Sequence, residues 1–408
     1  MEHAEILISG AGIVGLSIAR ELLRRGYENI VLLEKETDVG KHASGRNSGV
    51  LHAGIYYAPG STKAQTCLRG NRMMREYCRE KGLPLEQSGK VIVASSHDEH
   101  ERLLALYDRA RTIGAAVSLI DTKELAEIEP AAATVEKAIH SPETAVINPK
   151  RIVQHLVKDI TADGRARILF ETAFVRPIRP GLALTTSGPL RYRRFINASG
   201  AYSDVVAQAF GLGHAYQLVP FKGLYRQLVP ERRGMIRGSI YPVPDIRNPF
   251  LGVHFTKSVA GEVHIGPTAI PALGRENYSL FGGLDAEAFR FAWRDVVLFT
   301  RNAKFRTIAL TEPRKYMFSQ FFKDASKLVK HLNPTDIAPS SKVGIRPQLV
   351  NVQTNELVMD FLVEEHDGDI HILNAISPAF TSSFAFAETI ADLFDSQETK
   401  TPDHNDPA

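Results

Sequence analysis

The chain has 408 residues, of which 44% are hydrophobic and 23% charged, ordinary values for a globular protein long enough to bury a deep pocket. Its 49 lysines and arginines nearly balance its 46 aspartates and glutamates, so the formal net charge of +3 gives no electrostatic case for a nucleic-acid partner. The two cysteines, Cys67 and Cys78, form no CxxC motif and no His/Cys ligand pattern. We therefore expect no disulfide framework, no metal site and a reducing, cytoplasmic compartment.

No part of the sequence reads as a targeting or membrane-spanning segment. No apolar run reaches the roughly 18 residues that a transmembrane helix needs, and the first residues lack the basic segment and cleavage site of a signal peptide. A peripheral contact with the inner membrane stays open. The polar, proline-containing end, residues 396–408, is expected to be a disordered tail.

Residues 5–36 read as strand, glycine turn, helix and strand, with apolar runs at both ends and apolar residues at helical spacing between them. Gly10, Gly12 and Gly15 complete the pattern G-x-G-x-x-G, which gives a tight turn, a close backbone approach to a pyrophosphate and close packing of helix on strand. Glu34 ends the second strand, where a carboxylate accepts hydrogen bonds from an adenosine ribose. The segment predicts a dinucleotide site, and an acid at this position favours NAD or FAD.

The next loop, "SGRNSGVLHAGIYY", combines small residues with polar ones. Small residues at Ser44, Gly45, Ser48 and Gly49 allow a ligand to approach the backbone, whereas Arg46 and Asn47 supply donors suited to phosphate or a polar ring edge. His52 and Tyr57 follow as groups able to exchange protons. A surface turn with core tyrosines is the alternative interpretation.

The rest of the chain alternates between helical and strand patterns. A helix is expected from about Thr62, a strand over 90–95, a helix over 98–114, a strand and short helix up to Pro130, a helix from Pro149, and three strands within 167–200. Closely spaced strands follow over 216–267, then a long helical region over 285–331, further strands over 343–375, and a closing helix over 378–395.

This order predicts an α/β protein, α+β overall, in which a Rossmann-like domain is interrupted by a second domain built on a mixed or antiparallel sheet with helices. The dinucleotide-binding domain is expected to comprise residues 1–88, 146–215 and 336–395. The substrate-binding domain is expected to comprise residues 89–145 and 216–335.

The sequence resembles the FAD-dependent superfamily of D-amino-acid oxidase and glycerol-3-phosphate dehydrogenase, and within it the L-2-hydroxyglutarate oxidase/dehydrogenase family. The resemblance runs from about Ile6 to Phe394. Its marks are the motifs "GAGIVGLSIARELLRRG", "SGRNSGVLHAGIYYAPGSTKA", "FKGLY", "IYPVPDIRNPFLGVHFT", "IGPTA", "VGIRPQL" and "NAISPAFTSS". The chain departs from the family pattern at Pro347, among other positions. Such departures concern the identity of the substrate and not the binding of the flavin.

The resemblance implies FAD as cofactor, with its ADP half, pyrophosphate and flavin held by separate segments. The implied cofactor-binding residues are Gly10, Gly12, Gly15, Glu34, Lys35, Ser44, Arg46, Asn47, Ser48, Gly49, Val175, Ala198, Gly200, Thr381, Ser382 and Ser383. The last three open the closing helix, whose N-terminus would stabilise negative charge on a reduced flavin.

Oxidation of a 2-hydroxy acid requires a base that takes the hydroxyl proton while the C2 hydrogen leaves as hydride to flavin N5. His52 and His254 are the two candidates. Strand alternation places His254 opposite Val253 and Phe255, on the expected flavin side. A covalent flavin link at His52 and buried structural roles for both histidines are the alternatives.

A dicarboxylate substrate needs cationic or hydroxyl partners, because an unpaired buried charge is costly. The expected set is Arg346 and Tyr57 with either Lys222 or Tyr225. Lys222 and Tyr225 alternate along one strand, so both face the same pocket only if the strand is bulged at Gly223.

These expectations favour FAD-dependent oxidation of an L-2-hydroxy acid, L-2-hydroxyglutarate in the first place, to the 2-oxo acid. The rival activity is that of an amino-acid or amine oxidase of the glycine or sarcosine type. A flavin-binding protein without turnover is an alternative from another class. The electron acceptor is expected to be a quinone or oxygen.

Overall fold

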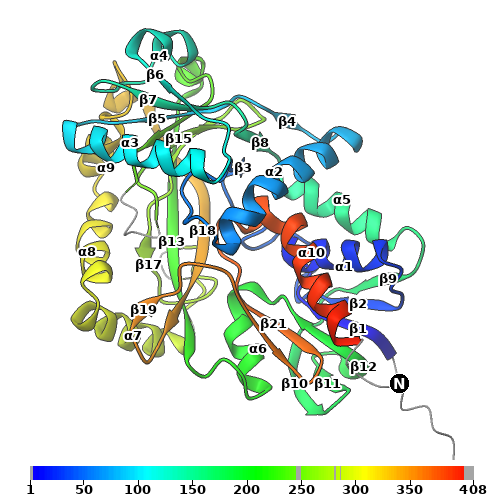
Figure 1. Cartoon of the computed structure of the whole chain (residues 1–408). Helices are drawn as coiled ribbons and strands as arrows, with labels where there is room; N and C mark the ends of the chain where they lie inside the picture. Colours follow the sequence, from blue (N-terminus) through cyan, green and yellow to red (C-terminus); the bar gives the residue numbers. More distant parts are fainter. Residues whose placement is uncertain (1–2, 245–249, 280–281, 285, 399–408) are drawn as a thin grey trace, which may run out of the picture.

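The computed structural model describes residues 3–244, 250–279, 282–284 and 286–398, and its strands form two large sheets with a small third one (Figure 1). The first large sheet, on the right in Figure 1, has a parallel centre in the order β21-β12-β1-β2-β9. Antiparallel strands β20, β11 and β10 extend it. Its strands are β1 (His3–Ser9), β2 (Ile30–Leu33), β9 (Ala166–Leu169), β10 (Phe174–Arg179), β11 (Leu182–Thr185), β12 (Gly188–Asn197), β20 (Leu362–His366) and β21 (Asp369–Asn374).

Helices cover both faces of this sheet, which explains why β2 is apolar and buried throughout and why Ile6, Leu7 and Ile8 of β1 are buried. Ile6 and Ile8 of β1 pack into the core shared with α1 and α10, whereas Ala4 and Leu7 point into the opposite core with Val206 of α6. The helices of this part are α1 (Ile13–Arg24), α5 (Pro149–Thr161), α6 (Ser203–Ala209), α10 (Ala379–Glu398) and α2 (Thr62–Glu80), which packs along α10.

The second large sheet has ten strands and is mostly antiparallel. Its longest strands, β13 and β18, pair over most of their length and run down the middle of the molecule (Figure 1). The members are β5 (Lys90–Val93), β6 (Ser118–Ile120), β7 (Ala138–Ser141), β13 (Tyr216–Leu228), β14 (Ser239–Pro242), β15 (His254–Lys257), β16 (Val263–Gly266), β17 (Ile270–Pro271), β18 (Ile337–Asn351) and β19 (Glu356–Leu357). Around this sheet lie α3 (His97–Thr112), α4 (Thr122–Ile128), α7 (Glu287–Arg301), α8 (Ala303–Thr311) and α9 (Phe318–Ala325) (Figure 1).

The small sheet consists of β3 (Val50–Leu51), β8 (Ala145–Ile147) and β4 (Leu85–Glu86). It continues directly from the loop that follows β2. The predicted α/β class with two unlike sheets is confirmed. The domain boundaries stay a prediction, although pairing with β13 joins β18 to the second sheet, whereas the prediction grouped residues 336–395 with the dinucleotide-binding domain.

Several predicted elements are divided in the structure. The helical region over 285–331 is three α-helices, separated at Asn302, which caps α8, and at a 3₁₀ turn that begins at Pro313. The first of the three strands expected within 167–200 splits into β9 and β10 at Glu171, whose φ is 51°. The predicted tail was wrong for residues 396–398, which belong to α10, and residues 399–408 lie outside the described residues.

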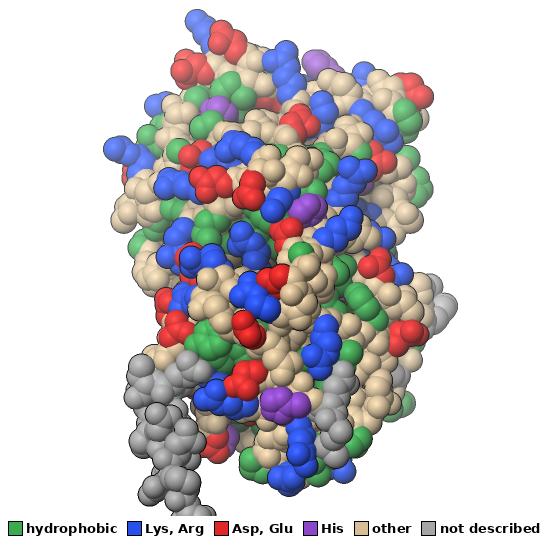
Figure 2. All heavy atoms as spheres, turned by 90° about the vertical axis from the view of Figure 1, so that its right-hand side faces the viewer, with side chains coloured by type: hydrophobic (Ala, Val, Ile, Leu, Met, Phe, Trp, Pro, Cys, Tyr) green, Lys and Arg blue, Asp and Glu red, His purple; other side chains and the backbone are tan. Residues whose placement is uncertain are grey.

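Two observations concern the surface. Within the described residues, no helix has the length and apolar character needed to cross a bilayer. Figure 2 shows the face on the right-hand side of Figure 1, where acidic and basic side chains are interspersed rather than segregated.

Candidate active site

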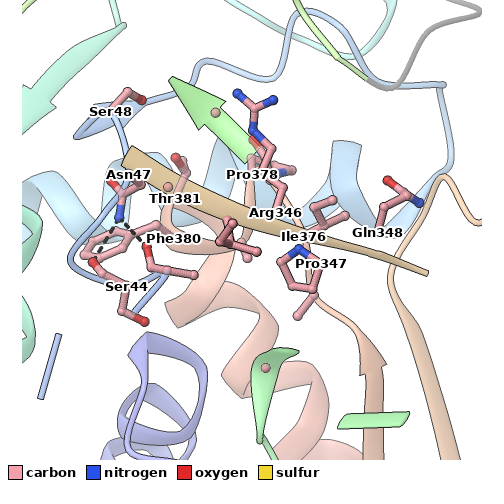
Figure 3. A pocket seen from close by; sticks show the side chains of 18 of the residues that line it. Ser44, Asn47, Ser48, Arg346, Pro347, Gln348, Ile376, Pro378, Phe380 and Thr381 are labelled. Carbon is pink, nitrogen blue, oxygen red and sulfur yellow. Dashed lines mark hydrogen bonds between the residues drawn. The ribbon is translucent and has the colours of Figure 1, made fainter. Parts of the chain in front are cut away.

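A cavity of about 360 Å³ lies between the two large sheets. It is bounded by the start of α1, the loop after β2, the middle of β13 and β18, the segment before β15 and the N-terminus of α10 (Figure 3). Among the described residues that line it, Arg46, Lys63 and Arg346 are cationic and none is Asp or Glu. The cavity therefore suits an anionic ligand.

The glycine turn between β1 and α1 has the geometry that close backbone approach requires. Gly10 has φ of 105°, and a Cβ there would lie 2.5 Å from the carbonyl oxygen of Ala198. A Cβ on Gly15 would lie 2.0 Å from the carbonyl oxygen of Gly10. Gly12 precedes α1, has no side chain to cap it and lines the cavity. The N-terminus of α1 thus faces a space that a pyrophosphate fits.

Glu34 lies beside this turn at the end of β2. Burial raises the pKa of its carboxyl group, and the backbone N–H groups of Glu36 and Ala11 act in the opposite direction. The N–H of Glu36 donates to Glu34 Oε1 over 3.1 Å. This position next to the glycine turn fits the predicted contact with an adenosine ribose.

Lys35, by contrast, does not line the cavity. Its ammonium lies 2.6 Å from one carboxylate oxygen each of Glu36 and Glu276, which are also close to His42. The two carboxylates and His42 could hold a metal ion by spacing alone. Because the Lys35 ammonium already supplies the positive charge between them, we propose no metal there.

The loop after β2 forms a wall of the cavity through Ser44, Arg46, Asn47 and Ser48. Ser44 Oγ accepts a hydrogen bond from the N–H of Ile13, 2.9 Å away, and so holds the loop against the first turn of α1. The amide of Asn47 donates to the Ser44 carbonyl oxygen over 2.9 Å and keeps the loop closed (Figure 3).

Arg46 lines the same wall with its guanidinium 4.2 Å from the ring centroid of Tyr278. Gly49 has φ of 77° and approaches the Ile147 carbonyl, but does not line the cavity. Ala198 and Gly200, at the end of β12, do line it. Val175 is 48% exposed on β10 and is not part of the cavity wall.

The N-terminus of α10 forms the opposite side of the cavity. Thr381 lines it, and Thr381 Oγ1 accepts a hydrogen bond from the N–H of His52 over 3.1 Å. Ser382 and Ser383 are buried behind Thr381 and do not line the cavity, so their hydroxyl groups point elsewhere. Any contact of Ser382 or Ser383 with a flavin would therefore be made by backbone groups, and their role stays a prediction.

His254 lines the cavity at the start of β15, whereas Val253 and Phe255 pack into the second core. Its Nδ1 lies 2.8 Å from the carbonyl oxygen of Gly252. A carbonyl only accepts, so Nδ1 carries the proton and Nε2 carries a lone pair. Burial, with smaller contributions from the nearby Arg346 and Lys90, lowers the pKa of His254 to about 3, although the hydrogen bond to Gly252 acts in the opposite direction.

His52 also lines the cavity, but its contacts are different. Its carbonyl oxygen accepts from the amide of Asn71, and within the described part of the chain its buried Nδ1 has no hydrogen-bond partner. Burial, with help from Lys90 and His254, lowers the pKa of His52 to about 3. Both histidines are therefore neutral at ordinary pH, and only His254 has its tautomer fixed by a hydrogen bond.

Three of the four predicted substrate residues line the cavity: Tyr57, Tyr225 and Arg346. Lys222 does not, because its ammonium donates to the carbonyl oxygen of Ser279 over 2.7 Å on the other side of β13. The irregularity in the pairing of β13 with β18 lies between Leu224 and Arg226, that is at Tyr225, two residues beyond the bulge expected at Gly223. The structure thus places Tyr225, and not Lys222, in the cavity wall.

Residues that were not predicted from the sequence include Lys63 and Tyr241, which line the cavity, and Lys90, which does not line it but lies close to its tyrosines. Lys63, near the start of α2, lines the cavity, and burial lowers its pKa to about 8. Tyr241 lines the cavity and stacks on His254 with ring centroids 3.9 Å apart. Lys90 is 1% exposed, its ammonium 4.5 Å from the ring centroid of Tyr56 and 5.0 Å from that of Tyr241. The motif "GSTKA" of the family resemblance contains Lys63 and was the one sequence feature that could have pointed to it. Nothing in the sequence around Lys90 distinguishes it from an ordinary exposed lysine.

The chain is similar to several known proteins over nearly its whole length. Residues 5–393 match the family described as FAD dependent oxidoreductase. The mitochondrial L-2-hydroxyglutarate dehydrogenase of Bos taurus is 35% identical, over 95% of this chain and 88% of that protein. The L-2-hydroxyglutarate dehydrogenase of the bacterium Indibacter alkaliphilus is 34% identical, over 95% of this chain and 98% of that protein.

Among solved structures, L-alpha-glycerophosphate oxidase from Mycoplasma pneumoniae with FAD bound superposes with a TM-score of 0.76 at 21% identity. The superposition covers 97% of this chain and 95% of that one. It shows the shared fold. The glycine turn, Glu34 and the wall formed by residues 44–48 fit the same cofactor. The chain therefore belongs to the FAD-dependent oxidoreductases and, within them, to the L-2-hydroxyglutarate dehydrogenase family.

Proposed function

We propose that this enzyme oxidises L-2-hydroxyglutarate to 2-oxoglutarate, with His254 as the base. The observation that carries the proposal is the cavity wall, which brings a neutral histidine of fixed tautomer together with Arg346 and Lys63 and, among the described residues, no carboxylate. The names of its relatives support the substrate.

The proton step follows from the hydrogen bond of His254. With Nδ1–H donated to Gly252, Nε2 accepts the hydroxyl proton of the substrate, and the imidazolium formed keeps its bond to the carbonyl oxygen. Bound FAD supplies the acceptor for the C2 hydride. Tyr241, stacked on the imidazole, holds the ring plane in place.

The two carboxylates of the substrate are matched by two buried cations. Arg346 offers a fork of donors from the middle of β18, and Lys63 offers a single ammonium from α2. Burial lowers the pKa of both groups, so a carboxylate bound beside them would offset the cost of burying their charges. Tyr225 and Tyr57 add hydroxyl groups on the same wall.

An anaerobic titration followed by flavin absorbance tests the proposal. L-2-hydroxyglutarate should bleach the flavin fully and fast, whereas its D-enantiomer, glycine and sarcosine should not. Bleaching by glycine or sarcosine without bleaching by L-2-hydroxyglutarate would establish the amine-oxidase alternative instead. If none of these compounds bleaches the flavin, the result would favour the alternative that the protein binds flavin without turnover.

The acceptor and the location are finer points of the same proposal. The relatives are named dehydrogenases, which supports a quinone rather than oxygen as acceptor. A cytoplasmic location with peripheral membrane contact stays a prediction, and the Bos taurus relative is named mitochondrial. The rate of flavin reoxidation by a soluble quinone should exceed the rate in air-saturated buffer. Equal or faster reoxidation by oxygen would make the protein an oxidase.

A further inference from the structure

Residues 274–279, here named the 274–279 segment, join the two large sheets outside the cavity. The segment follows β17, which pairs with β13 in the second sheet (Figure 1). Its side chains nevertheless reach the loop after β2, a strand of the first sheet. The Tyr278 hydroxyl lies 2.9 Å from His42 Nδ1, and the Glu276 carboxylate lies 2.6 Å from the Lys35 ammonium.

Buried cations anchor both ends of the 274–279 segment. At its start, the Arg275 side chain is 2% exposed and pairs over 2.6 Å with Asp204 of α6, a helix that packs on the first sheet. At its end, the Ser279 carbonyl oxygen accepts a hydrogen bond over 2.7 Å from the ammonium of Lys222 in β13. The two anchors come from different halves of the protein, so they fix the segment relative to both.

The charged groups where the segment meets the loop satisfy one another. Glu276 Oε1 accepts from the Tyr202 hydroxyl over 2.7 Å as well as from Lys35. Burial acts to raise the pKa of Glu276, but the hydrogen bonds from Lys35 and Tyr202 bring it below its usual value. Glu36 accepts from Lys35 and His42, and these bonds lower its pKa to about 2. Both carboxylates are therefore ionised near neutral pH and hold the Lys35 ammonium between them.

Tyr278 also supports Arg46, a cation of the cavity wall. The Arg46 guanidinium lies 4.2 Å from the ring centroid of Tyr278, and its Nε donates to the Lys41 carbonyl oxygen over 2.6 Å. Burial raises the pKa of Tyr278 to about 12, so the ring stays neutral. A guanidinium ordered by these two contacts loses less conformational entropy when it binds a phosphate.

We propose that the 274–279 segment is a cofactor clamp, which retains FAD by holding the loop after β2 against the dinucleotide site. Glu276 acts through Lys35, and Tyr278 acts through Arg46. Both are positioning residues, since neither is among the described residues that line the cavity. A guanidinium kept at the cavity wall offsets the charge of the pyrophosphate, and this favours retention of the ADP half of the cofactor.

Retention of FAD does not depend on which substrate the enzyme oxidises. A failure of the clamp proposal and a failure of the proposed reaction are therefore distinguishable. The measured quantity is the rate at which FAD leaves the diluted holoenzyme. Released FAD is separated by ultrafiltration at intervals and measured by its visible absorbance.

Three variants of the clamp give graded expectations. Tyr278→Ala removes the ring beside Arg46 and the contact with His42, and should raise the release rate roughly tenfold. Tyr278→Phe keeps the ring and should raise the rate less. Glu276→Gln keeps the shape but not the charge, and should raise it about two- to fivefold. These last two conservative variants decide the question if Tyr278→Ala gives no folded holoenzyme.

A double variant and a matched control separate positioning from a general loosening of the protein. Because Tyr278 acts through Arg46, Arg46→Met/Tyr278→Ala should release FAD little faster than Arg46→Met alone. Tyr107→Ala on α3 removes another ring that lies beside an arginine, with the Arg111 guanidinium 5.9 Å from its centroid. This control should release FAD as slowly as the unaltered enzyme does.

An excess of free FAD provides a second measurement. Added FAD should restore the full flavin content of the clamp variants, because their fold is intact and only retention is weakened. Flavin content that added FAD does not restore would indicate a merely structural role and would overturn the proposal. Unchanged release in Tyr278→Phe and Glu276→Gln, additive effects of Arg46→Met and Tyr278→Ala, or equal acceleration in Tyr107→Ala would overturn it as well.

Discussion

The imidazole of His254 and the phenol ring of Tyr241 are stacked, with their centroids 3.9 Å apart and their planes inclined by 26°. Together with the hydrogen bond from Nδ1 to the Gly252 carbonyl, the stack fixes both the tautomer and the plane of the proposed base. For His52, the other candidate, no partner of Nδ1 is found among the residues that the structure describes. The geometry therefore favours His254 and makes the choice open to experiment.

His254→Gln should lower kcat by about 10²- to 10⁴-fold, the usual contribution of a general base, while the protein keeps its flavin. Stopped-flow measurement of anaerobic flavin reduction gives the rate of the step directly. His52→Gln, the matched variant, should cost much less. If the rate of flavin reduction falls more in His52→Gln than in His254→Gln, His52 would be the base instead.

The pH profile of kcat/KM should lack an acidic limb between about pH 5 and pH 7, because the base must be neutral and the pKa of His254 is about 3. An alkaline limb should appear above pH 8, where Lys63 loses its proton and with it one attraction for the substrate. Lys63→Arg, which keeps the charge, should move this limb to higher pH. An alkaline limb that stays in place in Lys63→Arg would remove Lys63 from the substrate site.

Lys90→Met should raise the pKa of His254, because the buried ammonium nearby disfavours a second positive charge. The acidic limb of kcat/KM should then move toward neutral pH. Lys90→Arg keeps the charge and serves as the control. If Lys90 has only a structural role, Lys90→Met would change the stability or the flavin content of the protein without moving the acidic limb.

Arg346→Gln should raise KM for L-2-hydroxyglutarate by about 10- to 100-fold, since a charge-assisted hydrogen bond to a carboxylate contributes about 1.5–3 kcal/mol. The effect on kcat should be smaller if Arg346 binds the substrate equally in the ground and transition states. Arg226→Gln is the control, because Arg226 lies over the rings of Phe318 and Phe321 and not in the cavity. Equal KM values in both variants would contradict the assignment.

Arg275→Met should destabilise the protein by about 3–5 kcal/mol, because it leaves the fully buried Asp204 without its charge partner. Arg275 Nη1 lies 2.6 Å from Asp204 Oδ1, and their side chains are 2% and 0% exposed. Arg24→Ala removes the ion pair of Arg24 with Glu21. Because the Arg24 side chain is 61% exposed, this variant should lower the free energy of unfolding by under about 1 kcal/mol. Urea unfolding of the holoenzyme measures both, and equal losses would refute the difference.

The dinucleotide site could be predicted from sequence because its requirements are local. The glycines at positions 10, 12 and 15, the helix after them and Glu34 follow one another within one strand-turn-helix-strand unit, and their spacing alone limits what they form. The loop from Ser44 to Ser48 was predicted from its small residues and donors in the same way. Its contact with α1, through Ser44 and Ile13, was not.

The substrate side could be predicted only in part because it depends on strands distant in sequence. Alternation along β13 correctly separated Lys222 from Tyr225, but not which of the two faces the cavity. Lys63 and Lys90 were missed because a lysine is usually exposed. Nothing in their local sequence indicates that each is buried within the site.

By itself, then, the sequence determined the cofactor class, the two unlike sheets and the residues of the first wall, because these follow from short-range periodicity and glycine spacing. Only the tertiary structure decided which cations line the cavity and which of its two histidines has its tautomer fixed by a hydrogen bond. That choice depends on the long-range pairing of β13 with β18, and on the packing of Tyr241 between Lys90 and His254. The pairing of β13 with β18 and the contact of Lys90 with Tyr241 join residues far apart in the sequence, and the burial that such packing produces lowers the pKa of His254 and Lys63.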